Sequence, residues 1–125
     1  MIFFRFLYQG GHYSATRAKP AGLMPNRGLD DRLEISTFEL GGLPDEAVWE
    51  HCDVHGRKDL VAKAAAVLDE PAVAESGLLA QIREPPPRHW RLVGWPGDDG
   101  QDAKDQQKAI AQALAARARL ISRPP

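Results

Sequence analysis

The hydrophobic residues at the start of the chain follow a period of two, which is the period of a β-strand. In residues 2–8 they form two alternating rows, with Ile2, Phe4, Phe6 and Tyr8 in one and Phe3, Arg5 and Leu7 in the other. This pattern predicts a strand with one face fully buried. Gly10-Gly11 follows and would end it.

Three later stretches also have β character. Residues 33–40 contain Ile35, Thr37 and Phe38, which favour strands, and Gly41-Gly42 follows them. Residues 77–83 alternate in the same way and lead into the prolines at 85–87. Residues 90–95 are the expected neighbour of that strand. The chain therefore predicts a sheet of about four strands.

A helix is predicted over residues 44–55. Pro44 suits the first helical turn, and Asp45 and Glu46 complement the positive end of the helix dipole. Gly56 follows as a C-terminal stop. The apolar stripe of this helix is thin, so we expect it to pack on a sheet by one edge.

Two further segments have helical character. Residues 103–121 place Ile110, Leu114, Ala118 and Ile121 on one face, with Asp102 as the expected cap. Residues 59–68 consist of strong helix formers, including an alanine run, and Pro71 would end that helix. Residues 71–76 could add one more helical turn.

The segment between residues 10 and 32 has no clear period. It is rich in glycine, proline and polar residues, so we expect an irregular surface segment. A loop of this length in a small domain is usually functional or mobile.

Composition narrows the class of protein. At 125 residues the chain has the size of one domain, and its formal net charge of −1 removes the global positive field of most nonspecific nucleic-acid binders. The single Cys52 excludes an intramolecular disulfide and favours the cytoplasm. The apolar start is too short for a membrane anchor and contains Arg5, so it is not a signal sequence.

These patterns predict one α+β domain over residues 1–125. We expect a mixed or antiparallel sheet covered on one face by the helices at 44–55 and 103–121.

Basic and hydroxyl side chains gather in two stretches, after the first strand and after the prolines. If the strand at 2–8 neighbours the strand at 89–94, these stretches meet and form a local site for phosphate or carboxylate. The candidate ligands are His12, Ser14, Arg17, Lys19, Arg88 and His89, with Tyr13, Thr16 and Arg91 nearby.

Two alternatives stay open for these residues. His12 and His89 could act as base and acid in phosphodiester transfer. Alternatively, Arg88 and Arg91 could pair with Glu84 or with the acidic residues at 98–102, leaving the histidines solvated on loops.

Other motifs predict no metal or cofactor. His51 and His55 have the i, i+4 spacing that a metal can bridge, but further ligands are missing, so we expect a surface pair beside a buried Cys52. The spacing of the aspartates does not match a calcium loop. Trp90 and Trp95 have opposite parity on a strand, so at least one belongs to the core. No phosphate loop, dinucleotide motif or nucleophile elbow is present.

Several short sequence motifs together resemble those of a group of small bacterial proteins of uncharacterised function. They are His12-Tyr13-Ser14, Arg17-Ala18-Lys19-Pro20, Pro86-Pro87-Arg88-His89 and Gly94-Trp95-Pro96. The resemblance implies a stand-alone domain in which His12, Arg17, Lys19, Arg88 and His89 belong together. It implies no reaction.

The leading expectation for function is a non-enzymatic binding or interaction protein with a local anion site. Its partner would be a small anionic ligand or another protein; nucleic acid is less favoured by the net charge, and no membrane is expected. The alternative is a small RNA- or phosphoester-directed enzyme that uses two histidines.

Overall fold

The structure is a computed structural model that describes residues 1–97 and 100–125. Its described residues form seven strands, three α-helices and two 3-10 turns. The strands are β1 (Ile2–Leu7), β2 (Asn26–Arg27), β3 (Leu33–Glu39), β4 (Ala64–Asp69), β5 (Leu79–Ile82), β6 (His89–Val93) and β7 (Arg119–Ser122). The helices and turns are α1 (Asp45–His55), α2 (Glu70–Glu75), α3 (Gln101–Arg117), η1 (Gly10–His12) and η2 (Pro20–Leu23).

The strands form one sheet in the order β5-β6-β3-β1-β4-β7, and β2 pairs with β3 beside this path. Every pairing in the sheet is antiparallel. The α+β class is therefore confirmed, although the sheet has more strands than predicted, because the sequence patterns predict no strand at β2, β4 or β7. Among the described residues, no helix is long and apolar enough to cross a membrane.

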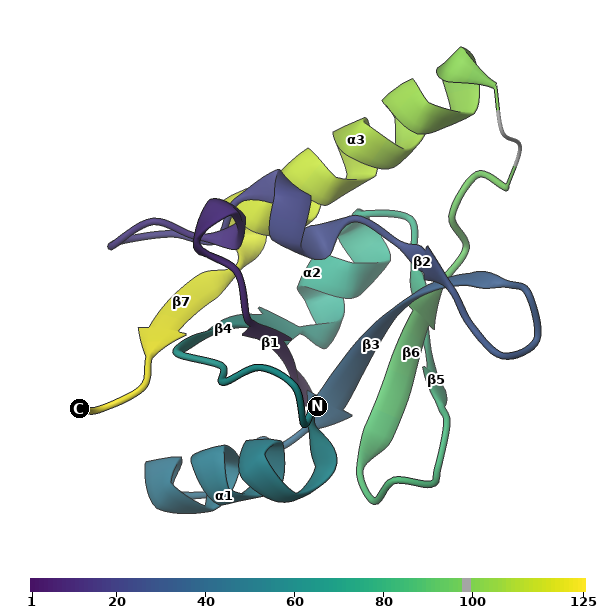
Figure 1. The fold of residues 1–125 in the computed structure, drawn as a ribbon. Coiled ribbons are helices and arrows are strands. Elements are labelled where there is room, and N and C mark those ends of the chain that lie inside the picture. The colour runs from purple at the N-terminus through teal and green to yellow at the C-terminus, as the bar shows by residue number, and fades with distance from the viewer. Residues whose placement is uncertain (98–99) are drawn as a thin grey trace.

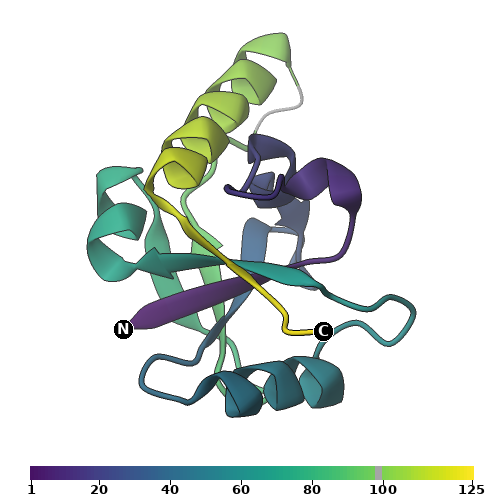
Figure 2. The ribbon, with the colours of Figure 1, turned by 90° about the vertical axis from the view of Figure 1, so that its left-hand side faces the viewer.

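The two long helices lie on opposite faces of the sheet, with α3 above it and α1 below it in both views (Figures 1 and 2). Phe3 and Leu7 of β1 pack in the same cluster as Leu114 of α3. Phe4 and Phe6 pack with α1. The prediction that both helices cover one face is wrong, because both rows of β1 carry large apolar side chains and each needs a cover.

The helix predicted at 59–68 is also wrong, because this segment contains β4. Ala64, Ala65 and Ala66 are completely buried between β1 and β7. Ala64 and Ala66 face the α3 side, and Ala65 faces the α1 side. Tertiary contacts on both faces outweigh the helix propensity of alanine in this position.

The C-terminal helix is shorter than predicted. It begins at Gln101 after Gly100, without a side-chain cap, and Asp102 lies in its first turn. It ends at Arg117, and residues 119–122 form β7 at the edge of the sheet. Leu120 and Ile121 pack into the clusters on the two faces, which suits a strand rather than the last turn of a helix.

The other predicted elements are confirmed with small shifts of their ends. They are the strands β1, β3, β5 and β6, the helix α1, and the helical turn α2, which Asp69 caps through the backbone N–H of Ala72 at 2.9 Å. The irregular segment from 10 to 32 folds as η1, η2 and β2.

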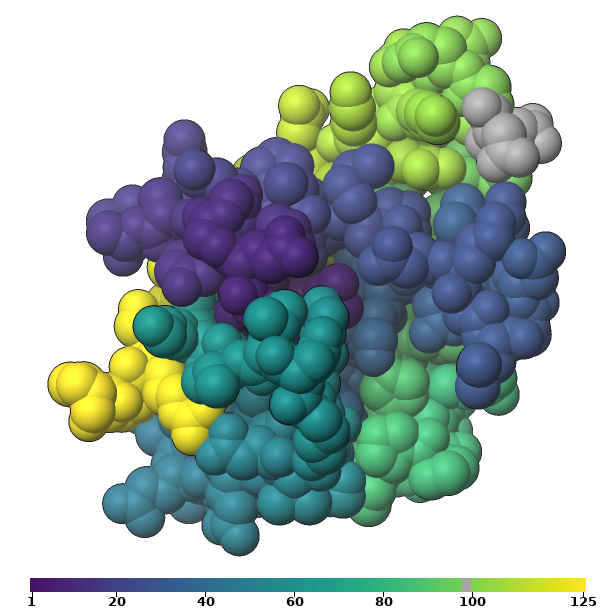
Figure 3. All heavy atoms as spheres, viewed as in Figure 1, coloured from purple at the N-terminus to yellow at the C-terminus, as the bar shows by residue number. Residues whose placement is uncertain are grey.

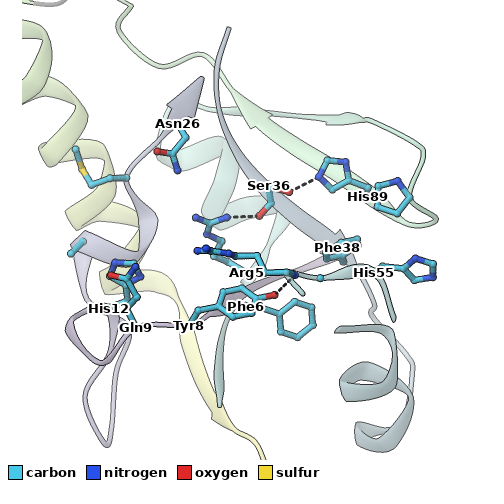
Figure 4. A pocket seen from close by; sticks show the side chains of 15 residues that line it. Arg5, Phe6, Tyr8, Gln9, His12, Asn26, Ser36, Phe38, His55 and His89 are labelled. Atoms are coloured by element: carbon cyan, nitrogen blue, oxygen red, sulfur yellow. Dashed lines mark hydrogen bonds between the residues drawn. The ribbon is translucent and has the colours of Figure 1, made fainter. Parts of the chain in front are cut away.

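The first strand and the strand β6 are not neighbours, since β3 lies between them. Within the described residues, β1 and β3 pair only where Phe3 faces Glu39 and Phe4 faces Phe38. β1 then stays paired with β4 up to Leu7, and β3 stays paired with β6. The two central strands therefore diverge from this end, and the sheet opens between Arg5 and Ser36 (Figure 4).

Candidate anion-binding pocket

A cavity of about 710 Å³ lies at the opening between β1 and β3. Its walls come from β1, the two 3-10 turns, β3, the end of α1 and the start of β6. Figure 3 shows the η1–η2 segment in purple and blue, the chain after α1 in teal and the β5–β6 hairpin in green meeting on one face. A cavity of this size suits a small-molecule ligand.

Arg5 projects into the opening between the two strands (Figure 4). Its Nη1 donates to the carbonyl oxygen of Ser36 at 3.1 Å, and its Nε donates to the carbonyl oxygen of Gly22 at 3.3 Å. Both partners are backbone carbonyls. Within the described part of the chain, no carboxylate forms an ion pair with this guanidinium.

The electrostatics of the pocket are those of a cation without a counter-ion. Burial lowers the pKa of the Arg5 guanidinium, and the positive charge of Arg57 lowers it further. An arginine side chain nevertheless stays protonated in proteins. None of the described residues that line the cavity is an aspartate or a glutamate. The site is therefore locally positive in a chain with a formal net charge of −1.

His12 lies in the same pocket at the end of η1. Its backbone is pressed against Gly22, where an added Cβ would come within 2.9 Å of the His12 Cβ. Burial lowers the pKa of His12, and Arg5 lowers it as well. The ring is therefore held towards its neutral form, as a free base.

His89 contributes the opposite side of the pocket (Figure 4). Its Nδ1 lies 2.7 Å from the carbonyl oxygen of Arg83, and its Nε2 lies 2.5 Å from Ser36 Oγ. A carbonyl oxygen can only accept, so Nδ1 carries the proton and Nε2 of the neutral ring accepts from the serine hydroxyl. The β5–β6 pairing and the hairpin between the strands hold this arrangement.

Tyr8 and the residues after α1 form another wall of the pocket. The Tyr8 hydroxyl accepts from the backbone N–H of Arg57 at 3.1 Å and lies 3.8 Å from Cys52 Sγ. Burial raises the pKa of Tyr8 to about 12, so the phenol is neutral at physiological pH. The Arg57 side chain is paired with Asp59 at 2.5 Å.

The pocket brings together only part of the predicted ligand set. His12 and His89 both line it, whereas Ser14, Arg17, Lys19 and Arg88 are not among its lining residues. The Ser14 hydroxyl instead accepts from the backbone N–H of Arg17 at 3.3 Å within its own turn. Arg88, which is exposed, donates through Nη1 to the carbonyl oxygen of Glu39 at 3.3 Å.

The alternative prediction, in which Arg88 and Arg91 pair with acidic residues, is right about the pairing and wrong about most of the partners. Arg91 pairs with Asp30 at 2.6 Å and with Glu34 at 3.6 Å, which are far along the chain from the acidic stretch after residue 97. Glu84 does contact Arg88, but through the backbone N–H of Arg88 at 2.8 Å. Asp98 and Asp99, which belong to the acidic stretch, lie outside the described residues.

The tryptophans and the histidine pair considered in the sequence analysis make packing and hydrogen-bond contacts within the fold. Trp95 is buried and donates to the carbonyl oxygen of Leu92 at 3.0 Å, while Trp90 packs against Phe3 with ring centroids 5.7 Å apart. The rings of His51 and His55 contact each other with centroids 4.6 Å apart and planes tilted by 47°, beside the buried Cys52. No group of three possible metal ligands occurs among the described residues.

Sequence reasoning missed Arg5 and Ser36, which form the centre of the pocket. Arg5 carried a signal, because it is the one charge inside an otherwise apolar strand, and such a charge needs a partner or a ligand. Ser36 carried none, since its contact with His89 depends on the pairing of β3 with β6.

Comparison of the chain with protein-family models, with curated proteins and with solved structures gives no significant match.

Proposed function

We propose that the protein binds a small phosphate- or carboxylate-bearing ligand in the pocket between β1 and β3. The observation that carries this proposal is Arg5, a partly buried cation that lines the cavity and whose hydrogen-bond partners among the described residues are backbone carbonyls. Arginine binds phosphate and carboxylate through paired, charge-assisted hydrogen bonds. A bound anion would supply the counter-charge that the described residues around Arg5 do not.

The geometry leaves part of the guanidinium available. Among the described residues, Arg5 Nη2 donates no hydrogen bond. Every fully buried side-chain nitrogen or oxygen among them has a hydrogen-bond partner, so Nη2 is not one of the fully buried atoms. Arg5 itself lines the cavity. His12 and the Ser36 hydroxyl lie within the same walls and can add hydrogen bonds to a ligand.

The experiment is a titration of the labelled protein with inorganic phosphate, followed by NMR. We expect Arg5→Gln to weaken phosphate binding at least tenfold, since a hydrogen bond between charged groups contributes about 1.5–3 kcal/mol. Arg17→Gln is the matched control, because it removes the same charge from an exposed turn outside the pocket. Its affinity should stay within about twofold of the wild type.

Equal losses in the two variants would show that phosphate responds to net charge alone. That result, or saturable shifts confined to residues outside the pocket, would contradict the proposal.

A phosphoester-directed enzyme is the second candidate function. It is favoured by one observation, namely that His12 and His89 line one cavity and lie on opposite sides of Arg5 (Figure 4). A histidine held neutral can serve as a base, and an arginine can stabilise the charge that develops on a phosphoryl group.

A further inference from the structure

We propose that Ser36 is a nucleophile, that His89 is its general base, and that the pair acts on phosphoesters whose phosphoryl group is held by Arg5. This inference rests on the proposed anion site and gives the second candidate function a covalent mechanism. Nothing in the sequence marks Ser36, because it lies within a strand rather than in a nucleophile elbow.

Two short contacts connect Ser36, His89 and the carbonyl group of Arg83. Ser36 Oγ lies 2.5 Å from His89 Nε2, and His89 Nδ1 lies 2.7 Å from the carbonyl oxygen of Arg83. A serine nucleophile needs a base within hydrogen-bond reach and a third group that orients the base. Here a backbone carbonyl takes the orienting role that a carboxylate has in the familiar serine triad.

The fold fixes both partners. Ser36 faces Arg91 in the register between β3 and β6, and Phe38 faces His89, so the serine and the histidine are two positions apart on adjacent strands. The backbone N–H of Arg83 also donates to the carbonyl oxygen of His89 at 2.8 Å. The Phe38 ring packs against the imidazole with centroids 5.4 Å apart, which restricts its orientation.

Ser36 and His89 line the same cavity as the Arg5 guanidinium. Arg5 Nη1 donates to the backbone carbonyl oxygen of Ser36 at 3.1 Å, and both residues line the cavity. A phosphoryl group that binds Arg5 in this cavity would share it with Ser36 and His89. The guanidinium would then stabilise the additional negative charge of the transition state.

The chemical steps balance without a further reagent apart from water. Ser36 Oγ attacks phosphorus as its proton passes to His89 Nε2, the new O–P bond forms, and the bond from phosphorus to the leaving alcohol breaks. The leaving oxygen departs on the side of phosphorus opposite Ser36 Oγ, so the imidazolium returns its proton to that alcohol through water. Water then attacks the phosphoserine as His89 takes its proton, the bond between phosphorus and Ser36 Oγ breaks, and the proton returns to Oγ, which releases phosphate and the free serine.

The first experiment is to treat the unmodified protein with an alkyl fluorophosphonate, in which the serine oxygen displaces fluoride from phosphorus. Peptide mass mapping should place the adduct on Ser36. The other serines are internal controls: Ser14 and Ser122 have no histidine partner among the described residues, and Ser76 donates to the carbonyl oxygen of Ala72 at 2.8 Å. Because this measurement needs no substitution, it does not depend on whether a variant folds.

Variants then test the roles of the partners. Ser36→Ala should abolish labelling, and His89→Gln should slow it at least about a hundredfold, which is the lower range for a general base. Arg17→Gln should label at the wild-type rate.

The outcomes separate this inference from the anion site. Phosphate binding without an adduct on Ser36 overturns the inference and leaves the anion site in place. An adduct on Ser36 without phosphate binding supports the nucleophile and overturns the phosphoester class. Absence of both overturns both, and labelling that is as fast in His89→Gln overturns the role of the histidine.

Discussion

Arg5 shows how one residue can be unfavourable for folding and still be central to the proposed anion site. A paired carboxylate usually offsets the cost of desolvating a cation. Asp30 and Glu34 have this role for Arg91. Arg5 has two carbonyl oxygens instead. Residues kept in such surroundings are concentrated at functional sites.

Gly22 is the residue that lets His12 and Arg5 approach each other. An added Cβ would lie 2.9 Å from the His12 Cβ and 3.0 Å from Leu7 Cδ2, and the Gly22 carbonyl is also a partner of Arg5. We expect Gly22→Ala to lower the free energy of unfolding by about 1–3 kcal/mol, as overpacking does, and to weaken phosphate binding. Urea denaturation and the phosphate titration measure the two effects.

Gly11→Ala is the matched control, since nothing lies within 4 Å of its added Cβ. It should change stability by no more than about 0.5 kcal/mol. If Gly22→Ala were equally harmless, the close contact between η1 and η2 would not position the pocket.

Among the elements, those with a strong local pattern could be predicted from the sequence. The alternation in residues 2–8 and the signals at both ends of residues 44–55 identify β1 and α1 because the information lies within each segment. Local pattern fails for β4, whose alanines favour a helix in isolation and are buried on both faces in the sheet. It fails again at residue 118, where the chain leaves α3 to pair with β4.

The same limit explains what could be predicted of the site. His12 and His89 could be singled out by residue type, although the expected pairing of their strands is wrong. Ser14, Arg17, Lys19 and Arg88 have the right chemistry but lie in other surroundings, which only the fold determines. Ser36 becomes a candidate only through the register of β3 and β6.

The strand assignment of β4 can be tested through Ala65. This side chain is completely buried on the α1 side of the sheet, opposite Phe6 of β1. Ala65→Leu should destabilise the protein by about 1–3 kcal/mol through overpacking. Ala116→Leu, on the exposed side of α3, should change stability by no more than about 0.5 kcal/mol, and chemical denaturation compares the two. Equal stabilities would contradict the central position of β4.

At the scale of the whole molecule, two histidines should make stability depend on pH. Burial lowers the pKa of His12 and of His51, with Arg5 adding to the first and His55 to the second. The unfolded chain therefore takes up protons at a higher pH than the folded protein. Stability should be full above the ordinary histidine pKa of about 6.5 and should fall as the pH drops from there towards the lower folded values.

Urea midpoints at about pH 7.5 and about pH 5.5 measure this effect, over a range in which most carboxylates remain ionised. Each histidine contributes at most about 1.4 kcal/mol per pH unit. His12→Gln should reduce the slope, and millimolar phosphate should offset the part due to His12, since a bound anion favours the protonated ring. A stability that rose on acidification would have the wrong sign.

The divergence of β1 and β3 has a mechanical consequence. The sheet consists of two ladders, β5-β6-β3 with β2 and β1-β4-β7, that are joined by backbone pairing near Phe3 and Phe4 and lie apart at the other end. Arg5 belongs to one ladder, and Ser36 and His89 belong to the other. A ligand held by all three would bridge the two ladders. Ligand binding and the width of the opening would therefore be coupled.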